Sequence, residues 1–559
     1  MTSLSAHVAQ ALAPHVSRAF GVMGNGNAHF LDALLDTRVT FTAVRHETGA
    51  VAAADGYYRA CGELAIGTTT YGAGFTNTVT ALAESVRARI PLVLVVGDVP
   101  TTGQRGWDVD QVALAAAVGA PTFRVGHADA AEATARAVEH ALAHRIPVVL
   151  AIPYDLAATD APDTPRASAA STPSAPTLDR AVLGAVAPVT ADGAALRTAA
   201  HALATAERPL IIAGRGAWLA SAGPELTGLA ERLGALTATS ALGVGLFGES
   251  GFDLGIAGGF GSEAAAAVMH ESDVVLVAGA SLNQFTMRFG DLLNPAATVL
   301  QIDTEAAATH PAVTGFLHGD VAAIAERLLV HFDDMPPAAS TWRSRIGAVP
   351  LGRAIEATVG DGLVWDGRLD PRSVALRLDG LLPEDRTVVQ DGGHFIGWAP
   401  SYWRIPSPDR LVMVGTAFQS IGLGFPSAVG VAVAVPESTI VLCTGDGGGL
   451  MALPDLESFI RTARSGIVVV FNDASYGAEV HQYGSKGLNT EPMLIDQIDF
   501  AGIARSFGGQ AVTVHTLSDL DALTEWIDGG AEGVILLDCI ISSTVVAPFM
   551  AEMVAVASR

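Results

Sequence analysis

The chain has few cysteines, few aromatic residues and no long apolar run. Its three cysteines, Cys61, Cys443 and Cys539, show no C-x-x-C spacing, so the sequence indicates neither a disulfide framework nor a cysteine zinc site. We expect buried thiols in a reducing compartment. No apolar run reaches the roughly 18 residues that a membrane-spanning helix needs, and the N-terminus lacks a basic region followed by an apolar block. These absences predict a cytoplasmic protein.

Basic residues are also scarce. There are 32 Lys and Arg residues against 57 Asp and Glu residues, a net charge of −25, and no basic cluster is present. This balance argues against nucleic acids and anionic membranes as partners. It does not exclude a small anionic substrate, because a few groups at the binding site can outweigh the effect of the net negative charge.

The chain is rich in hydrophobic residues, and they are distributed over three domain-sized segments. Half of its 559 residues are hydrophobic, and this length is enough for three domains of about 150–200 residues each. The sequence predicts three doubly wound α/β domains with mainly parallel sheets. The expected boundaries are a first domain at 1–156, a linker at 157–178, a central domain at 179–340, a linker at 341–370 and a third domain at 371–559.

Short apolar runs flanked by Gly, Pro or Asp predict the buried parallel strands. Several of them end in Gly or Asp, as strands do at the ligand-binding edge of a doubly wound sheet. The runs are 40–44, 91–97, 147–153, 209–214, 273–279, 298–303 and 467–471.

The most informative motif lies in the third domain. Gly445-Asp446-Gly447 precedes Asn472-Asp473, with an amphipathic segment and the strand 467–471 between them. This order is a βαβ unit that places both polar turns at one sheet edge. Oxygen-bearing side chains beside glycines that expose backbone N–H groups suit Mg²⁺ holding a diphosphate.

A second motif lies in the first domain. Glu47 ends Arg45-His46-Glu47 and opens an Ala-rich helix that includes Gly56 and Tyr57, and Tyr71-Gly72-Ala73-Gly74-Phe75-Thr76-Asn77 follows. A carboxylate packed among apolar residues should have a raised pKa, and it could share a proton with a weakly basic ring nitrogen. Taken alone, Glu47 could also be a residue stabilised by the helix dipole.

Together the two motifs resemble those of the thiamine diphosphate-dependent enzymes, in the acetolactate synthase-like and 2-oxo acid decarboxylase branch. The resemblance extends over nearly the whole chain. It implies a pyrimidine-binding first domain and a third domain that binds diphosphate and Mg²⁺. It also implies that each cofactor lies between two protomers, so a homodimer is the minimum and a homotetramer is common.

The resemblance assigns cofactor roles to individual residues. Glu47 would hydrogen bond the pyrimidine ring, the Gln419 carbonyl would accept from the cofactor amine, and Ile421 would support its bent form. The implied metal ligands are Asp446, Asp473 and the Ser475 carbonyl, although the family usually has Asn where this chain has Asp473. The remaining implied cofactor contacts are Asn77, Gly392, His394, Gly445, Gly447, Gly448 and Tyr476.

The substrate side is less determined. The loop Gly24-Asn25-Gly26-Asn27 matches a glycine-rich loop of the family, and Asp110-Gln111 stands where acetolactate synthases have Phe-Gln. Glu479 stands where simple decarboxylases carry a Glu, and His481 lies nearby. Two carboxylates, Asp110 and Glu479, sharing one pocket would repel each other, and one would stay protonated.

Several alternatives remain open at this stage. Gln111 favours carboligation of a 2-oxo acid or related ketone through an enamine, Glu479 favours simple decarboxylation, and cleavage of a diketone or acyloin is a third variant. Because the central domain has Gly279-Ala280-Ser281-Leu282-Asn283-Gln284-Phe285 in place of an Arg-rich stretch, the sequence weighs against FAD. A nucleotide-dependent oxidoreductase and a catalytically silent subunit are rival classes, the latter opposed by the presence of Glu47.

Overall fold

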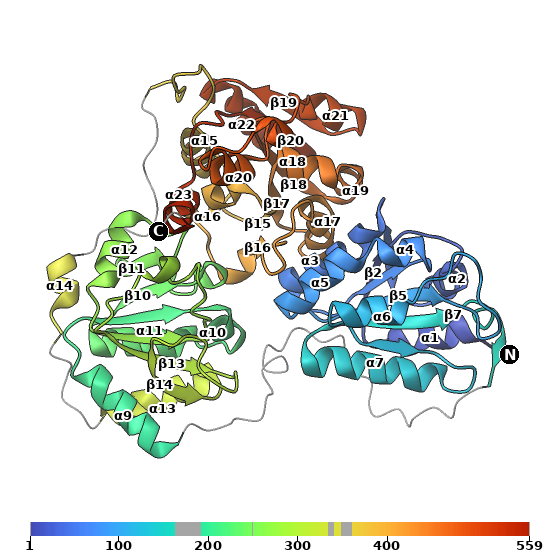
Figure 1. Ribbon diagram of the computed structural model, residues 1–559, viewed down its shortest axis with the longest axis horizontal. Helices are drawn as coiled ribbons and strands as arrows, with labels where there is room; N and C mark the ends of the chain where they lie inside the picture. Colours follow the sequence, from blue (N-terminus) through green and yellow to red (C-terminus); the bar gives the residue numbers. More distant parts are fainter. Residues whose placement is uncertain (1, 163–191, 249, 334–339, 348–359, 558–559) are drawn as a thin grey trace.

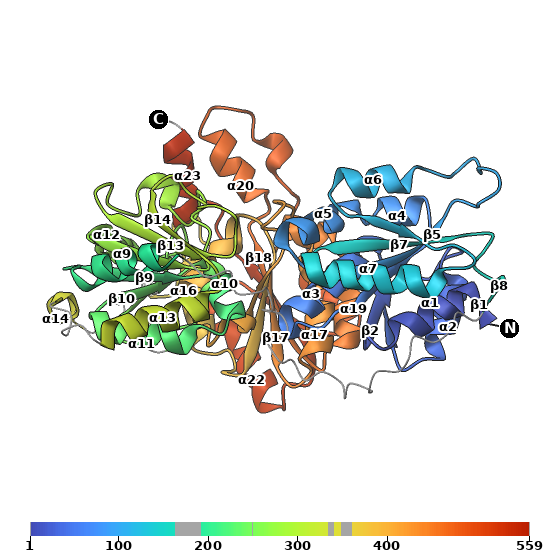
Figure 2. The same cartoon turned by 90° about the horizontal axis from the view of Figure 1, so that it is seen from below.

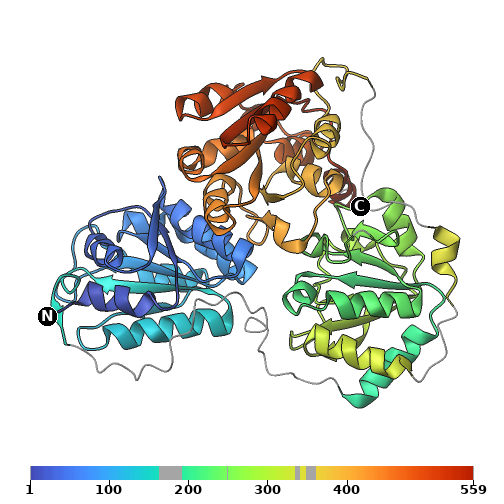
Figure 3. The ribbon, with the colours of Figure 1, turned by 180° about the vertical axis from the view of Figure 1, so that it is seen from behind.

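The computed structural model describes residues 2–162, 192–248, 250–333, 340–347 and 360–557. Within these residues the chain forms three α/β domains, each built on a six-stranded sheet (Figure 1). All neighbouring strands in the three sheets run parallel, and helices cover both faces of each sheet (Figure 3). The predicted fold class is therefore confirmed.

The first domain has the strand order β3-β2-β4-β5-β7-β6. The chain leaves β2 toward one side, forms β3, and then crosses to the other side for β4, so the topological switch point lies between β2 and β4. Its strands are β2 (Arg18–Gly21), β3 (Thr40–Ala43), β4 (Ile66–Thr69), β5 (Leu92–Asp98), β6 (Thr122–Arg124) and β7 (Pro147–Pro153). Its helices are α1 (Leu4–Leu12), α2 (Ala28–Leu35), α3 (Glu47–Cys61), α4 (Ala73–Thr76), α5 (Val79–Ala88), α6 (Gln111–Ala117) and α7 (Ala130–His144).

The third domain repeats this topology. Its order is β16-β15-β17-β18-β20-β19, and it matches the first domain strand for strand, with the switch point between β15 and β17. Its strands are β15 (Arg386–Gln390), β16 (Leu411–Met413), β17 (Thr439–Gly445), β18 (Ser465–Asn472), β19 (Gln510–Val514) and β20 (Gly533–Ile540). Its helices are α15 (Pro371–Asp379), α16 (Trp398–Tyr402), α17 (Gly424–Ala434), α18 (Asp446–Met451), α19 (Pro454–Thr462), α20 (Gly477–Glu479), α21 (Phe500–Ser506), α22 (Asp521–Asp528) and α23 (Pro548–Ala557).

The central domain has a different order, β11-β10-β9-β12-β13-β14. This is the arrangement of nucleotide-binding doubly wound sheets. Its strands are β9 (Pro209–Ala213), β10 (Leu236–Thr239), β11 (Asp253–Ile256), β12 (Val274–Ala278), β13 (Thr298–Asp303) and β14 (Val313–His318). Its helices are α9 (Gly193–Ala204), α10 (Arg215–Leu219), α11 (Gly223–Leu233), α12 (Glu263–His270), α13 (Val321–Asp333) and α14 (Trp342–Ile346).

Most of the expected linker at 157–178 and part of the one at 341–370 lie outside the described residues. Within the described parts, β1 (Thr2–Ser3) pairs antiparallel with β8 (Asp160–Ala161), and Trp342 of α14 is buried against the central domain. The thiols of Cys443 and Cys539 are buried and Cys61 is half-buried, and all three are free. Among the described helices, none is long and apolar enough to cross a membrane.

The third domain packs against both other domains (Figure 2), and the first and central domains also touch, since Arg215 donates to the Ala88 carbonyl at 2.9 Å. Helices α3 and α17 pack against each other where the third domain meets the first domain, and their side chains share one apolar core. Glycines allow the two helices to approach: a Cβ on Gly430 would overlap the Ala53 carbonyl oxygen, and a Cβ on Gly56 would overlap that of Ser427. This packing fixes the direction of α3 and therefore the place of Glu47 at its N-terminus.

We expect Gly430→Ala to destabilise the protein by about 1–3 kcal/mol, because the neighbour that must move is helix backbone and not a flexible side chain. The change should appear as a lower midpoint of thermal unfolding. Gly228→Ala in α11 is the matched control, since its new Cβ would lie 3.7 Å from the Leu329 methyl groups. Removing a glycine from that helix should leave the midpoint unchanged or raise it. Equal midpoints for both variants would contradict the role given to Gly430.

Candidate active site

Three turns of the third domain meet at the carboxyl edge of its sheet, where β15, β17 and β18 end. The switch point between β15 and β17 is the position at which doubly wound sheets bind ligands. The turns surround one cavity. Its lining includes Gly392, Gly393, His394, Phe395, Ile421, Gly445, Asp446, Gly447, Gly448, Phe471, Asp473, Ser475, Tyr476, Gly477, Ala478, Glu479 and Ile541.

Two buried carboxylates face this cavity. Asp446 accepts from the backbone N–H of Gly447 at 2.9 Å and of Ser475 at 3.2 Å, and Asp473 accepts from the Ser475 N–H and hydroxyl at 3.1 and 3.0 Å. Burial raises the pKa of Asp446 to about 7, with repulsion from Asp473 adding to it, and burial raises the pKa of Asp473 to about 6. Among the described residues no Lys or Arg lines the cavity, so a bound cation would stabilise both charges.

The neighbouring Asn472 points elsewhere. Its amide donates to Asp538 at 2.9 Å and to the Ile498 carbonyl at 3.2 Å, while its oxygen accepts from Gln497 at 2.8 Å. All of its polar atoms are therefore used inside the domain. Of the Asn-Asp pair only Asp473 reaches the cavity, as the assignment of Asp473 requires.

The glycines of the turns leave no space for side chains. A Cβ on Gly447 would lie 2.7 Å from the Tyr476 ring, and a Cβ on Gly445 would lie 2.8 Å from the Phe395 ring. The backbone therefore forms the cavity wall directly, and the turn after β17 opens α18 with its N-terminal N–H groups. Such a wall fits a phosphate-bearing ligand.

Asp391, to which the sequence assigned no role, joins its own turn after β15 to the turn after β16 and to the end of β17. Its buried carboxylate accepts from the N–H groups of Gly392 at 2.8 Å, Gly422 at 3.2 Å and Leu423 at 3.3 Å, and from the Thr444 hydroxyl at 3.3 Å. Burial outweighs these donors and raises the pKa of Asp391 to about 6. The sequence feature that could have identified Asp391 is its position directly after a buried strand and before two glycines.

His394 lines one side of the cavity, and His481 packs against it. His394 is buried, its Nε2 accepts from the Ala547 N–H at 2.8 Å, and burial together with His481 lowers its pKa to about 3. The ring centroids of His394 and His481 are 4.5 Å apart. His394 is therefore a neutral residue of the cavity wall. Glu479 lies on the same wall with its side chain exposed.

The turn that carries Gln419 and Ile421 is anchored to the first domain. The Phe418 N–H donates to Glu84 at 2.7 Å, and Glu84 is ion-paired with the buried Arg59 at 3.2 Å. Gln419 has a positive φ of 59° and an exposed side chain. Ile421 lines the cavity, whereas Gln419 does not.

Glu47 occupies a separate place, at the N-terminus of α3 in the first domain. Its Oε2 accepts from the Asn77 amide at 3.0 Å, and Thr48 donates to the Asn77 carbonyl at 2.5 Å. The preceding Arg45 N–H donates to Asp455 of α19 at 2.7 Å. Glu47 and Asn77 therefore form a half-exposed pair, and none of the described residues that line the third-domain cavity comes from the first domain.

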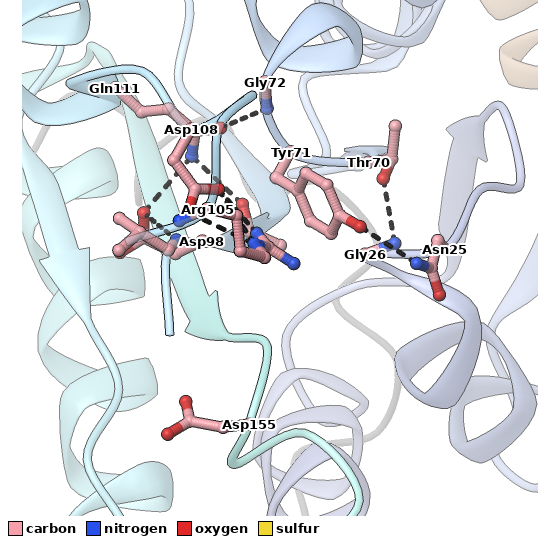
Figure 4. A network of polar contacts seen from close by, with 12 residues as sticks. Asn25, Gly26, Thr70, Tyr71, Gly72, Asp98, Arg105, Asp108, Gln111 and Asp155 are labelled. Atoms are coloured by element: carbon pink, nitrogen blue, oxygen red, sulfur yellow. Dashed lines mark hydrogen bonds and ion pairs between the residues drawn. The ribbon is translucent and has the colours of Figure 1, made fainter. Parts of the chain in front are cut away.

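The remaining first-domain residues gather where β2, β4 and β5 end (Figure 4). Gly26 N–H donates to Thr70 at 2.8 Å, and Asn25 donates to the Tyr71 hydroxyl at 2.9 Å. Asn27 is buried and donates to Thr68 at 3.0 Å. These contacts join the loop after β2 to the turn after β4 across the switch point.

Gln111 and Asp110 have local roles in the fold. The buried Gln111 accepts from the Gly72 N–H at 2.7 Å and donates to the Gly97 carbonyl at 3.0 Å. The exposed Asp110 caps α6 by accepting from Ala113 N–H at 2.9 Å. Asp110 and Glu479 belong to different domains, so their sharing of one pocket would depend on a second protomer and stays a prediction.

Comparisons with known proteins agree with this arrangement. Three family models match the chain: "Thiamine pyrophosphate enzyme, N-terminal TPP binding domain" over residues 2–117, the corresponding central domain over 196–328, and the C-terminal TPP binding domain over 391–539. Thiamine pyrophosphate is another name for thiamine diphosphate.

Similar proteins extend over almost the whole chain. A sulfoacetaldehyde acetyltransferase from Castellaniella defragrans is 29% identical, covering 94% of this chain and 91% of its own. The acetolactate synthase isozyme 3 large subunit of Escherichia coli is 27% identical over 91% and 88%. The fold matches that of the Rhodococcus jostii thiamine diphosphate-dependent 4-hydroxybenzoylformate decarboxylase, with a TM-score of 0.77, 20% identity and coverage of 97% and 99%. The chain therefore belongs to the thiamine pyrophosphate enzyme family.

Proposed function

We propose that this protein binds thiamine diphosphate and Mg²⁺ and uses them to form or break a C–C bond beside the carbonyl group of a 2-oxo acid or related ketone. The observation that carries the proposal is the pair of buried carboxylates, Asp446 and Asp473, in a glycine-walled cavity at the switch point of the third domain. Oxygen ligands of this kind suit Mg²⁺, which bridges readily to phosphate oxygens.

The residues present fit the cofactor. Asp446, Asp473 and the Ser475 carbonyl would hold the metal, and the N–H groups of the turns after β15 and β17 would bind the diphosphate. Ile421 would pack under the cofactor, Gln419 would accept from its amine, and Glu47 would hold a proton at the pyrimidine nitrogen. When bound, the cofactor supplies a nucleophilic carbon that attacks carbonyl groups.

A homodimer would complete the site. In one chain Glu47 lies apart from the third-domain cavity, so the two halves need a second protomer to meet. Exposed apolar side chains on both domains support such an interface, since large exposed apolar groups mark contact surfaces. They include Met23 and Trp107 in the first domain and Met451 and Leu494 in the third. A homotetramer would be two such dimers.

Carboligation of the acetolactate synthase type is the leading reaction, supported by the full-length similarity to acetolactate synthase subunits. Acyl transfer is a second candidate, because sulfoacetaldehyde acetyltransferases are similar over the same length. Simple decarboxylation and non-decarboxylating cleavage of a diketone or acyloin are the other variants. Family membership leaves the nucleotide-dependent oxidoreductase without support.

The reaction is tested with a panel of 2-oxo acids, diketones and sulfoacetaldehyde, each with and without an acceptor aldehyde, in the presence of thiamine diphosphate and Mg²⁺. An optically active hydroxyketone would identify carboligation, and CO₂ without a coupled product would identify decarboxylation. Turnover of sulfoacetaldehyde that depends on an added acyl acceptor, such as inorganic phosphate, would favour acyl transfer. Failure of the protein to bind the cofactor in calorimetry would overturn the proposal.

Glu47→Gln should slow hydrogen–deuterium exchange at the reactive carbon of the bound cofactor by about 10²–10⁴-fold, because glutamine cannot exchange a proton with the pyrimidine nitrogen. Quenched exchange followed by NMR measures this without any substrate. Glu132→Gln is the matched control, since Glu132 also lies in the first turn of a helix, α7, and is exposed. It should exchange at the wild-type rate. Unchanged exchange in Glu47→Gln would remove Glu47 from the proposed role.

Mg²⁺ should bind about tenfold more tightly at pH 8 than at pH 6 when thiamine diphosphate is present. The raised pKa of Asp446, about 7, means that the folded protein holds a proton there at pH 6, and the metal must displace it. The stability of the metal-free protein changes with pH in the opposite direction. Because folding raises the pKa of Asp446, its protonated form stabilises the folded state at low pH, and this contribution is lost as the pH rises through 7. Titration calorimetry at the two pH values measures the affinities.

Asp473→Asn provides the comparison for this pH dependence. Removing the second carboxylate removes the repulsion that adds to the raised pKa of Asp446, so the difference in Mg²⁺ affinity between pH 6 and pH 8 should shrink. Burial, the larger cause, remains, so the difference should not vanish. Equal affinities at both pH values in the wild type would contradict the assignment of Asp446 as a ligand.

A further inference from the structure

Tyr71 stands two residues after the end of β4, at the switch point of the first domain. It opens the segment that ends with Asn77, the partner of Glu47. Its ring lies against Gly26, where a Cβ would come within 2.6 Å of the Tyr71 Cδ1. Only a glycine in the loop after β2 therefore allows Tyr71 its present position. The side chain is half-buried.

The hydroxyl of Tyr71 has a free proton. Its oxygen accepts from the Asn25 amide at 2.9 Å (Figure 4), so this contact uses a lone pair and not the O–H. The Arg105 guanidinium is a second donor beside the same oxygen, and a guanidinium cannot accept a proton. Within the described part of the chain, no acceptor for the Tyr71 proton is present. A phenol that accepts one hydrogen bond can donate its own proton to another group.

A cation is held over the Tyr71 ring. The Cζ of Arg105 lies 4.0 Å from the centroid of the Tyr71 ring and 4.8 Å from that of Tyr154. Asp108 accepts from Arg105 Nε at 3.1 Å and from Nη2 at 2.7 Å, and its side chain is only 2% exposed. The ion pair fixes the guanidinium, and the guanidinium fixes the ring.

We propose that Tyr71 is a catalytic residue that donates its hydroxyl proton to the carbonyl oxygen of the substrate, and that Asn25 and Arg105 are its positioning residues. This inference rests on the proposed function. The substrate group on which Tyr71 would act is a neutral carbonyl oxygen that becomes negative during the reaction.

The step balances within the site. As a bond forms to the carbonyl carbon, the C=O π electrons move to oxygen, and that oxygen takes the Tyr71 proton. The phenolate oxygen left behind keeps its hydrogen bond from Asn25 and lies beside the Arg105 guanidinium, which favours the negative charge over the neutral form. When the carbonyl re-forms, its oxygen returns the proton to Tyr71. A proton donor placed in this way contributes about 10²–10⁴-fold to a rate.

The test compares two substitutions that remove the same proton in different ways. Tyr71→Phe removes the hydroxyl and keeps the ring. Asn25→Asp is nearly isosteric, but its carboxylate would accept the Tyr71 proton and withhold it from the substrate. We expect both variants to lose about 100-fold or more in kcat/KM, and the double variant to lose no more than either alone, because both act on one proton. A merely structural contact would survive Asn25→Asp, and independent effects would multiply.

Cofactor measurements separate this inference from the proposed function. Binding of thiamine diphosphate by calorimetry, and hydrogen–deuterium exchange at its reactive carbon, should be the same in wild type and Tyr71→Phe, because Glu47 and the third domain govern both. Tyr154→Phe is the matched control: it removes a hydroxyl from the second tyrosine ring that contacts Arg105 and should stay within about threefold of wild type. Wild-type turnover by Tyr71→Phe, or its loss of cofactor binding, would overturn the role of Tyr71 alone. Absence of cofactor binding in the wild type would overturn both proposals.

Discussion

The electrostatics of two neighbouring carboxylates is the constraint on which the site depends. Asp446 and Asp473 are buried together and receive only N–H and hydroxyl donors, so their ionised forms are costly without a cation. The third domain can hold these carboxylates together because other contacts, independent of the two carboxylates, fix the turns that carry them. Asp391 joins the turns after β15 and β16 to the end of β17 through four donors, and aromatic rings pack against Gly445 and Gly447. A rigid frame therefore keeps the two carboxylates together although each raises the free energy of the other.

The packing of α3 on α17 sets the second constraint. Gly56 and Gly430 allow the helices to touch, and the segment before α3 bonds to Asp455 of α19. Glu47 is thereby held beside the third domain but outside its cavity. A rotation of α3 that brought Glu47 to the cavity of its own chain would break the shared core of the two domains. The second protomer that we propose would therefore be needed because of helix packing and not because of the chemistry of the site.

Much of the fold could be predicted because the buried strands are continuous apolar runs. The expected strands at 147–153 and 298–303 agree with β7 and β13 residue for residue. Asp446 and Asp473 could also be predicted to lie together, since each follows a parallel strand and β17 pairs with β18. Asp391 could not be assigned, because its partners lie about 30 and 50 residues farther along the chain, and their approach depends on the folded sheet. Arg105 had no sequence signal at all: its ring partners come from the ends of different strands.

The first and third domains share one topology, yet their switch points carry opposite chemistry. The third-domain edge concentrates charge, which suits an ion-bridged diphosphate. The first-domain edge offers Asn25, Thr70 and Tyr71, and the cation that contacts Tyr71, Arg105, is neutralised by its pairing with Asp108. A neutral, hydrogen-bonding edge is what proton transfer to a carbonyl oxygen needs, because a full positive charge would bind the oxygen without supplying the proton. The Arg105–Asp108 pair therefore acts on the substrate only through the ring that it holds, which is why Tyr71 and not Arg105 is the group assigned to the reaction.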